Sequence, residues 1–197
     1  METPAVKKSV KGTQTEKNLA MSYMAETQAN ARYTFYAKVA NKEQYFPIEE
    51  IFKETAANEL HHAKIFLGFL EGGMVSGLTT SVDHAALATT ADNLKASIWE
   101  ETNEGVDAYV KFAQVADQEG FPVIASHFRA IAEIERHHKE RFEAWLKHVQ
   151  DGTVWKREQP IEWKCLVCGY IYKGTEPPTK CPACDHPYQH YMAQDIA

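Results

Sequence analysis

Two pairs of acidic and imidazole side chains repeat one spacing in the first 150 residues. Glu59 and His62 stand three residues apart, and Glu135 and His138 repeat the interval. Residues at i and i+3 share a face of a helix, so each pair projects from one side. The Glu59–His62 face continues into Phe66, seven residues after Glu59. Because charge on an apolar face is costly unless it is paired or bound to a metal, the pattern indicates a cation inside the protein.

Two other segments offer glutamates that suit the same site. Glu26 shares a helical face with apolar residues, and Glu101 and Glu104 stand three apart in EETNEG. Glu26 precedes Glu59 by 33 residues and Glu101 precedes Glu135 by 34, which is one helix, a turn and part of a second helix. Each pair should therefore lie at the same height in a helical hairpin. The predicted site contains Glu26, Glu59, His62, Glu101, Glu104, Glu135 and His138.

This set of side chains predicts a dinuclear metal centre. One Glu from each of two helices and Glu-x-x-His from each of two others is the ligand pattern of di-iron and di-manganese bundles. Carboxylates bridge two cations, imidazoles suit iron, and seven groups leave positions open for a small oxygen ligand. Glu104 has an alternative interpretation as a solvated residue. Glu100, His61 and His137 lie about a hundred degrees off the ligand stripes, which places them at the surface or behind the ligands.

Two tyrosines near these glutamates are interpreted first as core residues. They are Tyr33 and Tyr109. Their hydroxyls are also suited to hold ligand carboxylates in position, as outer partners of metal ligands do.

Four cysteines make a second candidate site near the end of the chain. Cys165 and Cys168 form one Cys-x-x-Cys, and Cys181 and Cys184 form another. Four thiolates in two such turns make a closed tetrahedral site for zinc or a single iron. The spacing slightly favours zinc. The surrounding aromatic residues favour iron, because they would limit water around the sulfurs and tune a redox potential.

The elements that must position these residues are helices followed by a small separate unit. Capping, proline and glycine signals predict four helices, at about 13–40, 47–72, 90–120 and 122–150. Residues 73–89 are long enough to cross the bundle end to end, which favours a ferritin-like arrangement over an up-down bundle with an ordinary loop. We therefore expect a mainly α fold: a mobile N-terminal arm at 1–12, a ferritin-like four-helix bundle with one long crossover at 13–150, and a small rubredoxin-like domain with a four-cysteine metal site at 155–197.

Composition excludes several classes of function. The net charge of −6 and the lack of a basic stripe argue against nucleic acid. No stretch of about 18 apolar residues predicts a membrane span, and the N-terminus lacks the apolar run of a signal peptide. We therefore expect a cytoplasmic protein, where reduced cysteines bind metal rather than form disulfides.

Taken together, these motifs resemble the rubrerythrin family across nearly the whole chain. The matching segments are KGTQTEKNL, AETQANARYTFYA, ETAANELHHAKIF, EETNEG, IERHHKERF and WKCLVCGYIYKG…CPACDHP. The resemblance implies two non-haem irons on the seven predicted ligands, Tyr33 and Tyr109 behind them, and one iron on the four cysteines, with zinc as a possible substitute. It also implies that Glu104 exchanges with His62 as a ligand. One departure is Asp185, where stand-alone rubredoxins usually have glycine.

The resemblance further implies a peroxidase that protects against oxidative stress. Hydrogen peroxide would be reduced to water with electrons relayed through the tail iron from rubredoxin or an NAD(P)H-dependent rubredoxin reductase. The tail lies roughly 21 Å along the last helix from His138, which is long for direct transfer. We therefore expect a homodimer, or a higher homo-oligomer, in which one tail serves the other subunit. The alternatives are a ferroxidase that handles iron and a metal-dependent sensing module.

Overall fold

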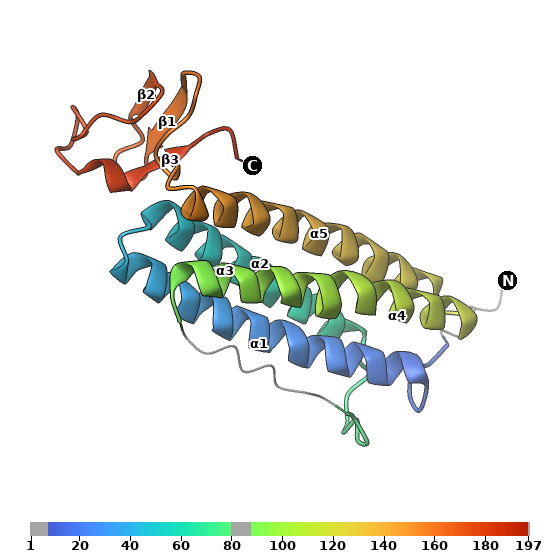
Figure 1. Cartoon of the computed structure of the whole chain (residues 1–197). Helices are drawn as coiled ribbons and strands as arrows, with labels where there is room; N and C mark the ends of the chain where they lie inside the picture. The colour runs from blue at the N-terminus through green and yellow to red at the C-terminus, as the bar shows by residue number, and fades with distance from the viewer. Residues whose placement is uncertain (1–7, 80–87, 197) are drawn as a thin grey trace, which may run out of the picture.

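The bundle is built from five α-helices and one turn of π-helix. The computed structural model describes residues 8–79 and 88–196, without the side chain of Glu104. The helical elements are α1 (Gln14–Lys42), α2 (Phe46–Phe69), α3 (Thr90–Glu100), the π-helix η1 (Glu101–Val106), α4 (Asp107–Gln118) and α5 (Pro122–Gln150). The first, second and fourth predicted helices are thus present, whereas the third is interrupted by η1. Figure 1 shows α3, η1 and α4 as one long rod beside α1.

Local signals in the sequence account for where the helices start. The hydroxyl of Thr13 accepts a hydrogen bond from the Glu16 amide, and Thr89 caps α3 through the Asp92 amide in the same way. Pro47 and Pro122 occupy the first turns of α2 and α5, where a missing N–H costs nothing.

The order of the helices requires a crossover. The Thr90 amide donates to Glu43 Oε2 at 3.0 Å, so α3 begins beside the α1–α2 turn. α2 ends at the opposite end of the bundle, where Glu71 accepts from the Val10 amide at 3.2 Å. The connection between α2 and α3 therefore returns along the length of the bundle (Figure 1). Residues 80–87 of it lie outside the described part, and so do residues 1–7 of the predicted N-terminal arm.

Two aromatic clusters fill the bundle and leave a polar layer between them. Phe66, Tyr109 and Phe128 belong to the cluster at the end away from the tail. Tyr33 and Phe52 belong to the cluster at the tail end, together with Phe142 and Trp145. Each cluster excludes water from one side of the layer, so charged groups in it are held at low dielectric.

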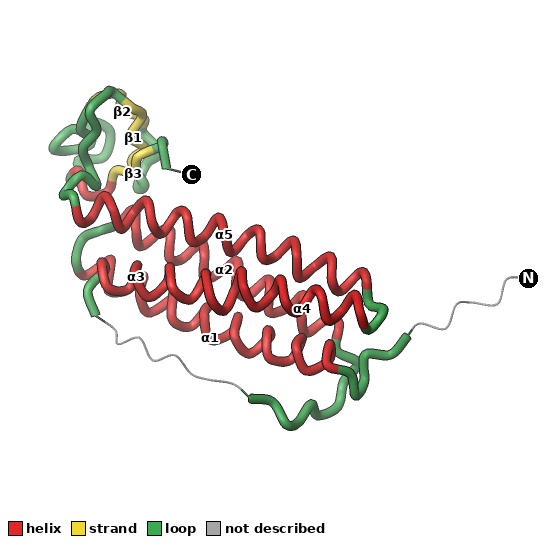
Figure 2. Tube along the Cα trace, turned by 45° about the vertical axis from the view of Figure 1, so that its right-hand side comes forward, coloured by secondary structure: helices red, strands yellow, loops and turns green. Residues whose placement is uncertain are grey.

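The tail is a three-stranded antiparallel sheet with strand order β2-β1-β3. Its elements are β1 (Ile161–Cys165), β2 (Ile171–Gly174), the 3-10 turn η2 (Tyr188–His190) and β3 (Tyr191–Ala193). Tyr45 stacks on Trp155 with ring centroids 5.7 Å apart, and Phe46 stacks on His190 at 3.9 Å. The sheet therefore sits on the end of the bundle that carries the α1–α2 turn, as Figure 2 also shows.

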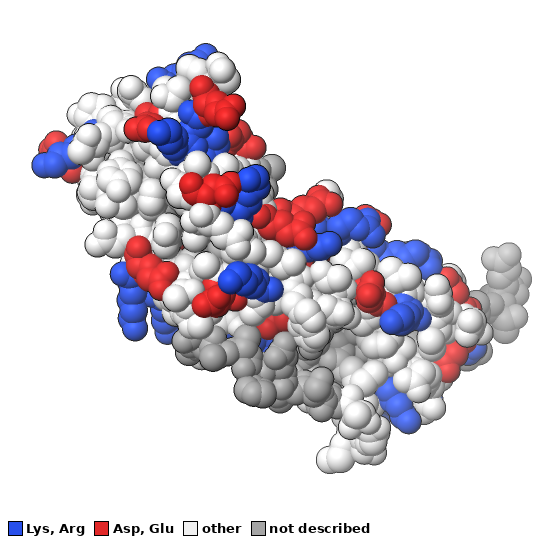
Figure 3. All heavy atoms as spheres, viewed as in Figure 1, with Lys and Arg blue, Asp and Glu red and all other residues white. Residues whose placement is uncertain are grey.

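Within the part of the chain that the structure describes, no helix is both long and apolar enough to cross a membrane. Lysines, arginines and acidic residues are interspersed over the bundle and the tail on the face seen in Figure 3.

Candidate metal centres

Six of the seven predicted bundle ligands converge in the polar layer. α1 contributes Glu26, α2 contributes Glu59 and His62, η1 contributes Glu101, and α5 contributes Glu135 and His138. All six side chains belong to residues that are 4% exposed or less. Glu104 lies in η1, but its side chain falls outside the described part of the structure, so its role as a ligand stays a prediction.

The six side chains form two overlapping groups. In one group, ligand atoms of Glu26, Glu59, His62 and Glu135 lie within 4.8 Å of one another. In the other, atoms of Glu59, Glu101, Glu135 and His138 meet the same limit. Glu59 and Glu135 belong to both groups. This arrangement suits two metal positions with two shared carboxylates, each position completed by one further Glu and one His.

Each imidazole faces several carboxylates. His62 Nδ1 lies 2.9 Å from Glu59 Oε2, 3.0 Å from Glu135 Oε1 and 3.8 Å from Glu26 Oε2. His138 Nδ1 repeats the pattern, at 2.9 Å from Glu135 Oε2 and 3.2 Å from Glu59 Oε1. The two rings lie 6.2 Å apart, centroid to centroid. In both histidines Nδ1 is thus the atom turned towards the carboxylates.

The electrostatics of the metal-free layer follow from this crowding. Burial lowers the pKa of His62, but hydrogen bonds to Glu135, Glu26 and Glu59 outweigh it and raise the pKa to about 12. The same competition raises the pKa of His138 to about 9. Without metal, both imidazoles are therefore cations at neutral pH and balance part of the carboxylate charge.

The carboxylates respond in different directions. Burial, reinforced by the charge of Glu135, raises the pKa of Glu26 well above its usual value, and burial does the same for Glu101. Burial also raises the pKa of Glu59, but its hydrogen bonds to His138 and His62 prevail and bring it to about 2.

The donor set fits a pair of metal ions. Glu59 Oε1 and Glu135 Oε1 are buried, and neither accepts a hydrogen bond of good geometry. Such groups are expensive to bury unless a cation or a donor satisfies them. Carboxylate oxygens and imidazole nitrogens are also the donors that iron accepts. The residues present therefore fit the predicted cofactor.

Two tyrosines hold the outer carboxylates in place. The hydroxyl of Tyr33 donates to Glu101 Oε1 at 2.6 Å, and that of Tyr109 donates to Glu26 Oε1 at 2.5 Å. Burial, with the nearby glutamate charges, raises the pKa of both phenols well above the usual value, so they remain donors. Each tyrosine also packs in one of the two aromatic clusters, so it links the core to one metal position.

The π-helix places α5 close to the chain at Gly105. A Cβ on Gly105 would lie 2.7 Å from Glu135 Cγ and 2.8 Å from Glu135 Cβ. Only glycine leaves room there for the shared carboxylate. The wider i→i+5 turn of η1 is a feature found frequently at functional sites, and here it carries Glu101.

Residues off the ligand stripes divide into two kinds. His61 and His137 are exposed, as the sequence indicates. Glu100 is 3% exposed, so its predicted surface position is wrong, and it lies behind the ligands. Its Oε1 forms an ion pair with Arg32 Nε at 3.0 Å. Sequence reasoning missed Arg32, because one arginine on a long helix carries no spacing signal.

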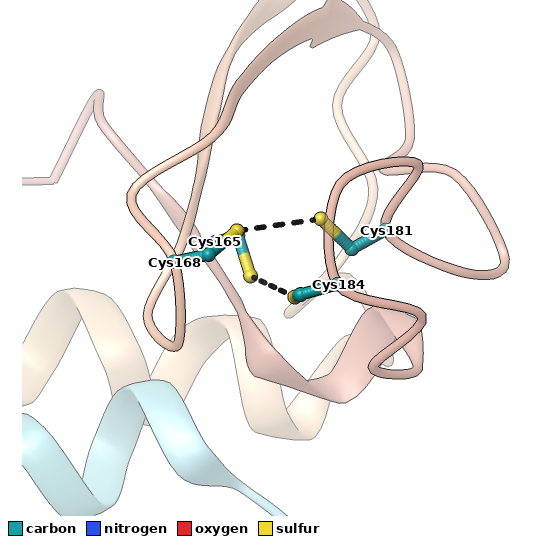
Figure 4. A group of neighbouring side chains, drawn as sticks. All are labelled: Cys165, Cys168, Cys181 and Cys184. Atoms are coloured by element: carbon teal, nitrogen blue, oxygen red, sulfur yellow. Dashed lines mark hydrogen bonds between the residues drawn. The ribbon is translucent and has the colours of Figure 1, made fainter.

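The four cysteines converge as predicted. The Sγ atoms of Cys165 and Cys184 lie 3.8 Å apart and those of Cys168 and Cys181 lie 3.6 Å apart, as Figure 4 shows. Tetrahedral bonds of about 2.3 Å to a central ion would place sulfurs about 3.8 Å apart. The thiols are free, and all four sulfurs lie within 4.8 Å of one another. The cluster therefore fits one tetrahedral ion.

Both cysteine turns have similar backbones. Gly169, after Cys168, has φ +79°, and Asp185, after Cys184, has φ +59°. Aspartate is one of the few residues other than glycine that tolerates this conformation. The departure at Asp185 thus preserves the shape of the turn.

Comparisons with known proteins match both parts of the chain. The rubrerythrin family model matches residues 17–146, and the rubrerythrin rubredoxin-like domain model matches residues 163–192. Rubrerythrin from Porphyromonas gingivalis is 46% identical over 93% of this chain and 92% of its own. Rubrerythrin from Nitratidesulfovibrio vulgaris is 40% identical over 93% and 96%.

A solved structure shares the arrangement of the whole chain. The all-ferrous, fully reduced state of nigerythrin superposes with a TM-score of 0.62 at 28% identity, covering 98% of this chain and 97% of that one. A bacterioferritin from Mycobacterium tuberculosis, at 14% identity and a TM-score of 0.60, shares the ferritin-like fold over 70% of this chain and 86% of its own. With two family models and full-length relatives in agreement, the chain belongs to the rubrerythrin family.

Proposed function

We propose that the protein is a peroxidase that reduces hydrogen peroxide to water at the bundle site, as protection against oxidative stress in the cytoplasm. The balanced reaction takes one H₂O₂, two electrons and two protons to two waters. The observation that carries the proposal is the pair of overlapping ligand groups that share Glu59 and Glu135. Two irons held there would supply the two electrons together and offer open positions to a small oxygen ligand.

The side chains of this chain would control charge and protons. Glu59 and Glu135 would hold the two metal positions together, while Glu26 with His62 and Glu101 with His138 complete one position each. Glu104 is proposed as the seventh ligand, which exchanges with His62. Glu26 and Glu101, whose pKa values burial raises, are suited to accept and release protons at their carboxylate oxygens.

The tyrosines would keep those carboxylates in place during the cycle. Tyr33 and Tyr109 each donate one O–H to an outer carboxylate, and their rings are buried in the aromatic clusters. The clusters exclude bulk water and strengthen every charge interaction in the layer.

Electrons would enter through the cysteine site. We propose one iron on Cys165, Cys168, Cys181 and Cys184, supplied by rubredoxin or an NAD(P)H-dependent rubredoxin reductase. The tail touches its own bundle at Phe46, and Glu59 lies 13 residues further along α2, roughly 20 Å away. Tunnelling falls steeply with distance, which supports a homo-oligomer in which one tail serves the bundle of another subunit.

The central test is anaerobic. Iron-loaded protein is reduced with dithionite, freed of reductant, and mixed with either hydrogen peroxide or O₂ while absorbance follows reoxidation. We expect peroxide to reoxidise the bundle irons much faster than O₂. Reoxidation by O₂ at an equal or higher rate would overturn the peroxidase proposal and favour a ferroxidase.

The route of the electrons has its own test. Full-length Cys168→Ser protein lacks a tail ligand, and full-length Glu135→Gln protein lacks a shared bundle ligand. Mixed oligomers of the two should recover donor-dependent peroxide reduction, because one subunit keeps a tail and the other a bundle site. Failure of every mixed oligomer to recover activity, with both metals loaded in the intact sites, would exclude transfer between subunits. A red colour that bleaches on reduction would identify iron in the tail, whereas zinc protein is colourless.

A further inference from the structure

A small cavity beside the carboxylates gives the bundle site a side open towards α1. The cavity has a volume of about 20 Å³, and its walls include Glu26, Glu59, Glu101 and Glu135. Such a volume admits a molecule of one or two oxygen atoms. Its inner end therefore lies against four of the predicted ligands.

The outer wall of the cavity is a stripe on α1. Ala25, Ala29 and Arg32 follow one another at intervals of four and three residues, so they share a helical face. These three are partly exposed, whereas the other residues around the cavity are mostly buried. The way out of the cavity thus passes between α1 and the α3–η1 rod.

An ion pair crosses this outer end. Arg32 on α1, with 14% of its side chain exposed, places Nε 3.0 Å from Oε1 of Glu100, the last residue of α3. Among the described residues around the cavity, Arg32 is the only lysine or arginine. The pair joins the two walls of the slot with a contact that side-chain rotation can break and remake.

We propose that this slot is the route by which small neutral ligands reach the metal pair, with Ala29 setting its width and the Arg32–Glu100 pair closing its mouth. The proposal rests on the proposed function, because it concerns the substrate of the same site. It restricts that substrate to neutral molecules of about two heavy atoms, such as hydrogen peroxide. Alkyl hydroperoxides are too bulky, and the carboxylates repel anions. Arg32 and Glu100 act as positioning residues.

A wider groove on the other side of the site is the rival route. It has a volume of about 550 Å³ between α2 and α5, and its walls include Asn58, His138 and Arg141. Of the six described ligands, only His138 reaches it. Asn58 Nδ2 lies 3.3 Å from His138 Nε2 and covers the outer edge of the ring. The groove therefore ends at the back of one ligand, whereas the slot ends among four carboxylates.

Entry is measured directly with nitric oxide, a neutral molecule of two heavy atoms that binds ferrous iron. Reduced, iron-loaded full-length protein is mixed with nitric oxide under anaerobic conditions, and the association rate is followed by absorbance at matched iron content. Ala29→Leu should slow association about tenfold. Ala31→Leu, an exposed position on the same helix, is the matched control and should leave the rate unchanged. If Ala29→Leu fails to load iron, Ala29→Val narrows the slot with a smaller side chain.

The mouth is tested in the opposite direction. Arg32→Ala should raise the rate of oxidation by tert-butyl hydroperoxide about tenfold relative to the rate with hydrogen peroxide, because the slot is wider. The control is Arg136→Ala, an exposed arginine on α5 that pairs with Glu133. A merely structural role of Arg32 would slow both oxidants together.

The outcomes separate the slot from the peroxidase proposal. An unchanged nitric oxide rate in Ala29→Leu, or a slowed rate in Asn58→Leu instead, overturns the slot even if peroxide remains the better oxidant. A slowed rate in Ala29→Leu supports the slot even if O₂ proves the better oxidant and the peroxidase proposal falls. Absence of nitric oxide binding in the unaltered protein overturns both.

Discussion

The two candidate metal sites are assembled in opposite ways. The bundle site draws six described side chains from α1, α2, η1 and α5, so residues from Glu26 to His138 must be brought together by the whole core. The cysteine site draws four sulfurs from two short turns within 20 residues of chain, from Cys165 to Cys184. A site built from four helices depends on helix packing and register, whereas a site built from two turns depends mainly on local backbone shape.

The difference extends to what each site does without metal. In the bundle, two imidazolium groups take over part of the charge balance, with pKa values raised to about 12 for His62 and about 9 for His138. In the tail, the four sulfurs face one another. Burial raises the pKa of Cys165, and the amides of Cys168 and Val167 oppose this by donating towards its sulfur. The bundle layer is therefore already charge-paired before metal enters, whereas the tail binds its ion by deprotonating thiols.

The largest expected effect comes from the shared carboxylates. Glu135→Gln removes one ligand from both bundle positions and should reduce bundle iron from about two per chain to near zero. Glu26→Gln removes a ligand from one position and should leave about one iron. Neither substitution should change the metal content or spectrum of the cysteine site, because the tail contacts only the far end of the bundle.

Metal analysis with absorbance spectroscopy checks this ranking. Glu133→Gln, an exposed glutamate on the same helix whose partner is Arg136, is the matched control and should load normally. Equal loss of iron in the Glu26 and Glu135 variants would show that the two positions do not share ligands. Loss of the tail metal in either variant would show that the two sites are not independent.

The sequence predicts those parts of the two sites that local spacing specifies. Glu-x-x-His on a helix and Cys-x-x-Cys in a turn each fix a short-range geometry, so Glu59 with His62 and Cys165 with Cys168 were predicted together. The 33 and 34-residue intervals carried the register between hairpins. Helix-start signals at Thr13, Pro47 and Pro122 placed the remaining elements.

Features that depend on packing escaped this approach. The π-helix has no sequence pattern of its own, because its i→i+5 bonds form only where the surrounding helices favour them. A straight α-helix turns about 100° per residue, so Glu100 next to Glu101 was expected to point elsewhere. It does point elsewhere, but towards Arg32 of a neighbouring helix rather than towards solvent. Burial of a residue off the main stripe requires knowing which helix covers it. The stacking of Tyr45 on Trp155 escaped prediction for the same reason.

The second effect is a pH dependence confined to the metal-free bundle. The pKa of His138 is raised from 6.5 to about 9 in the folded state, so its stabilising charge is fully present below pH 6.5 and is lost as pH rises through 9. Metal-free protein should therefore lose stability over that interval, on the order of a few kcal/mol. Iron-loaded protein should not, because its ligands already hold neutral imidazoles.

Chemical denaturation followed by helical circular dichroism measures this at about pH 6.5, about pH 8 and about pH 9. His138→Gln is the informative variant, since its metal-free form should lose most of the dependence. His137→Gln, an exposed histidine next to it, should keep the dependence of the unaltered protein. An equal loss of stability in loaded and metal-free protein would place the titrating groups outside the bundle site.

The smallest expected effect tests how the core fixes the outer ligands. Tyr109→Phe keeps the ring in its cluster and removes the O–H that donates to Glu26 Oε1. Loss of such an outer hydrogen bond typically weakens metal affinity roughly tenfold to a hundredfold. The weakening should fall on the Glu26 position alone, while Tyr33→Phe should weaken the Glu101 position, since its hydroxyl donates there. Titration of metal-free protein with Fe²⁺ under anaerobic conditions resolves the two steps, and the exposed Tyr170→Phe is the control. If both variants weaken the same step, the tyrosines act on the layer as a whole; if neither does, the carboxylates are fixed by the metals rather than by the core.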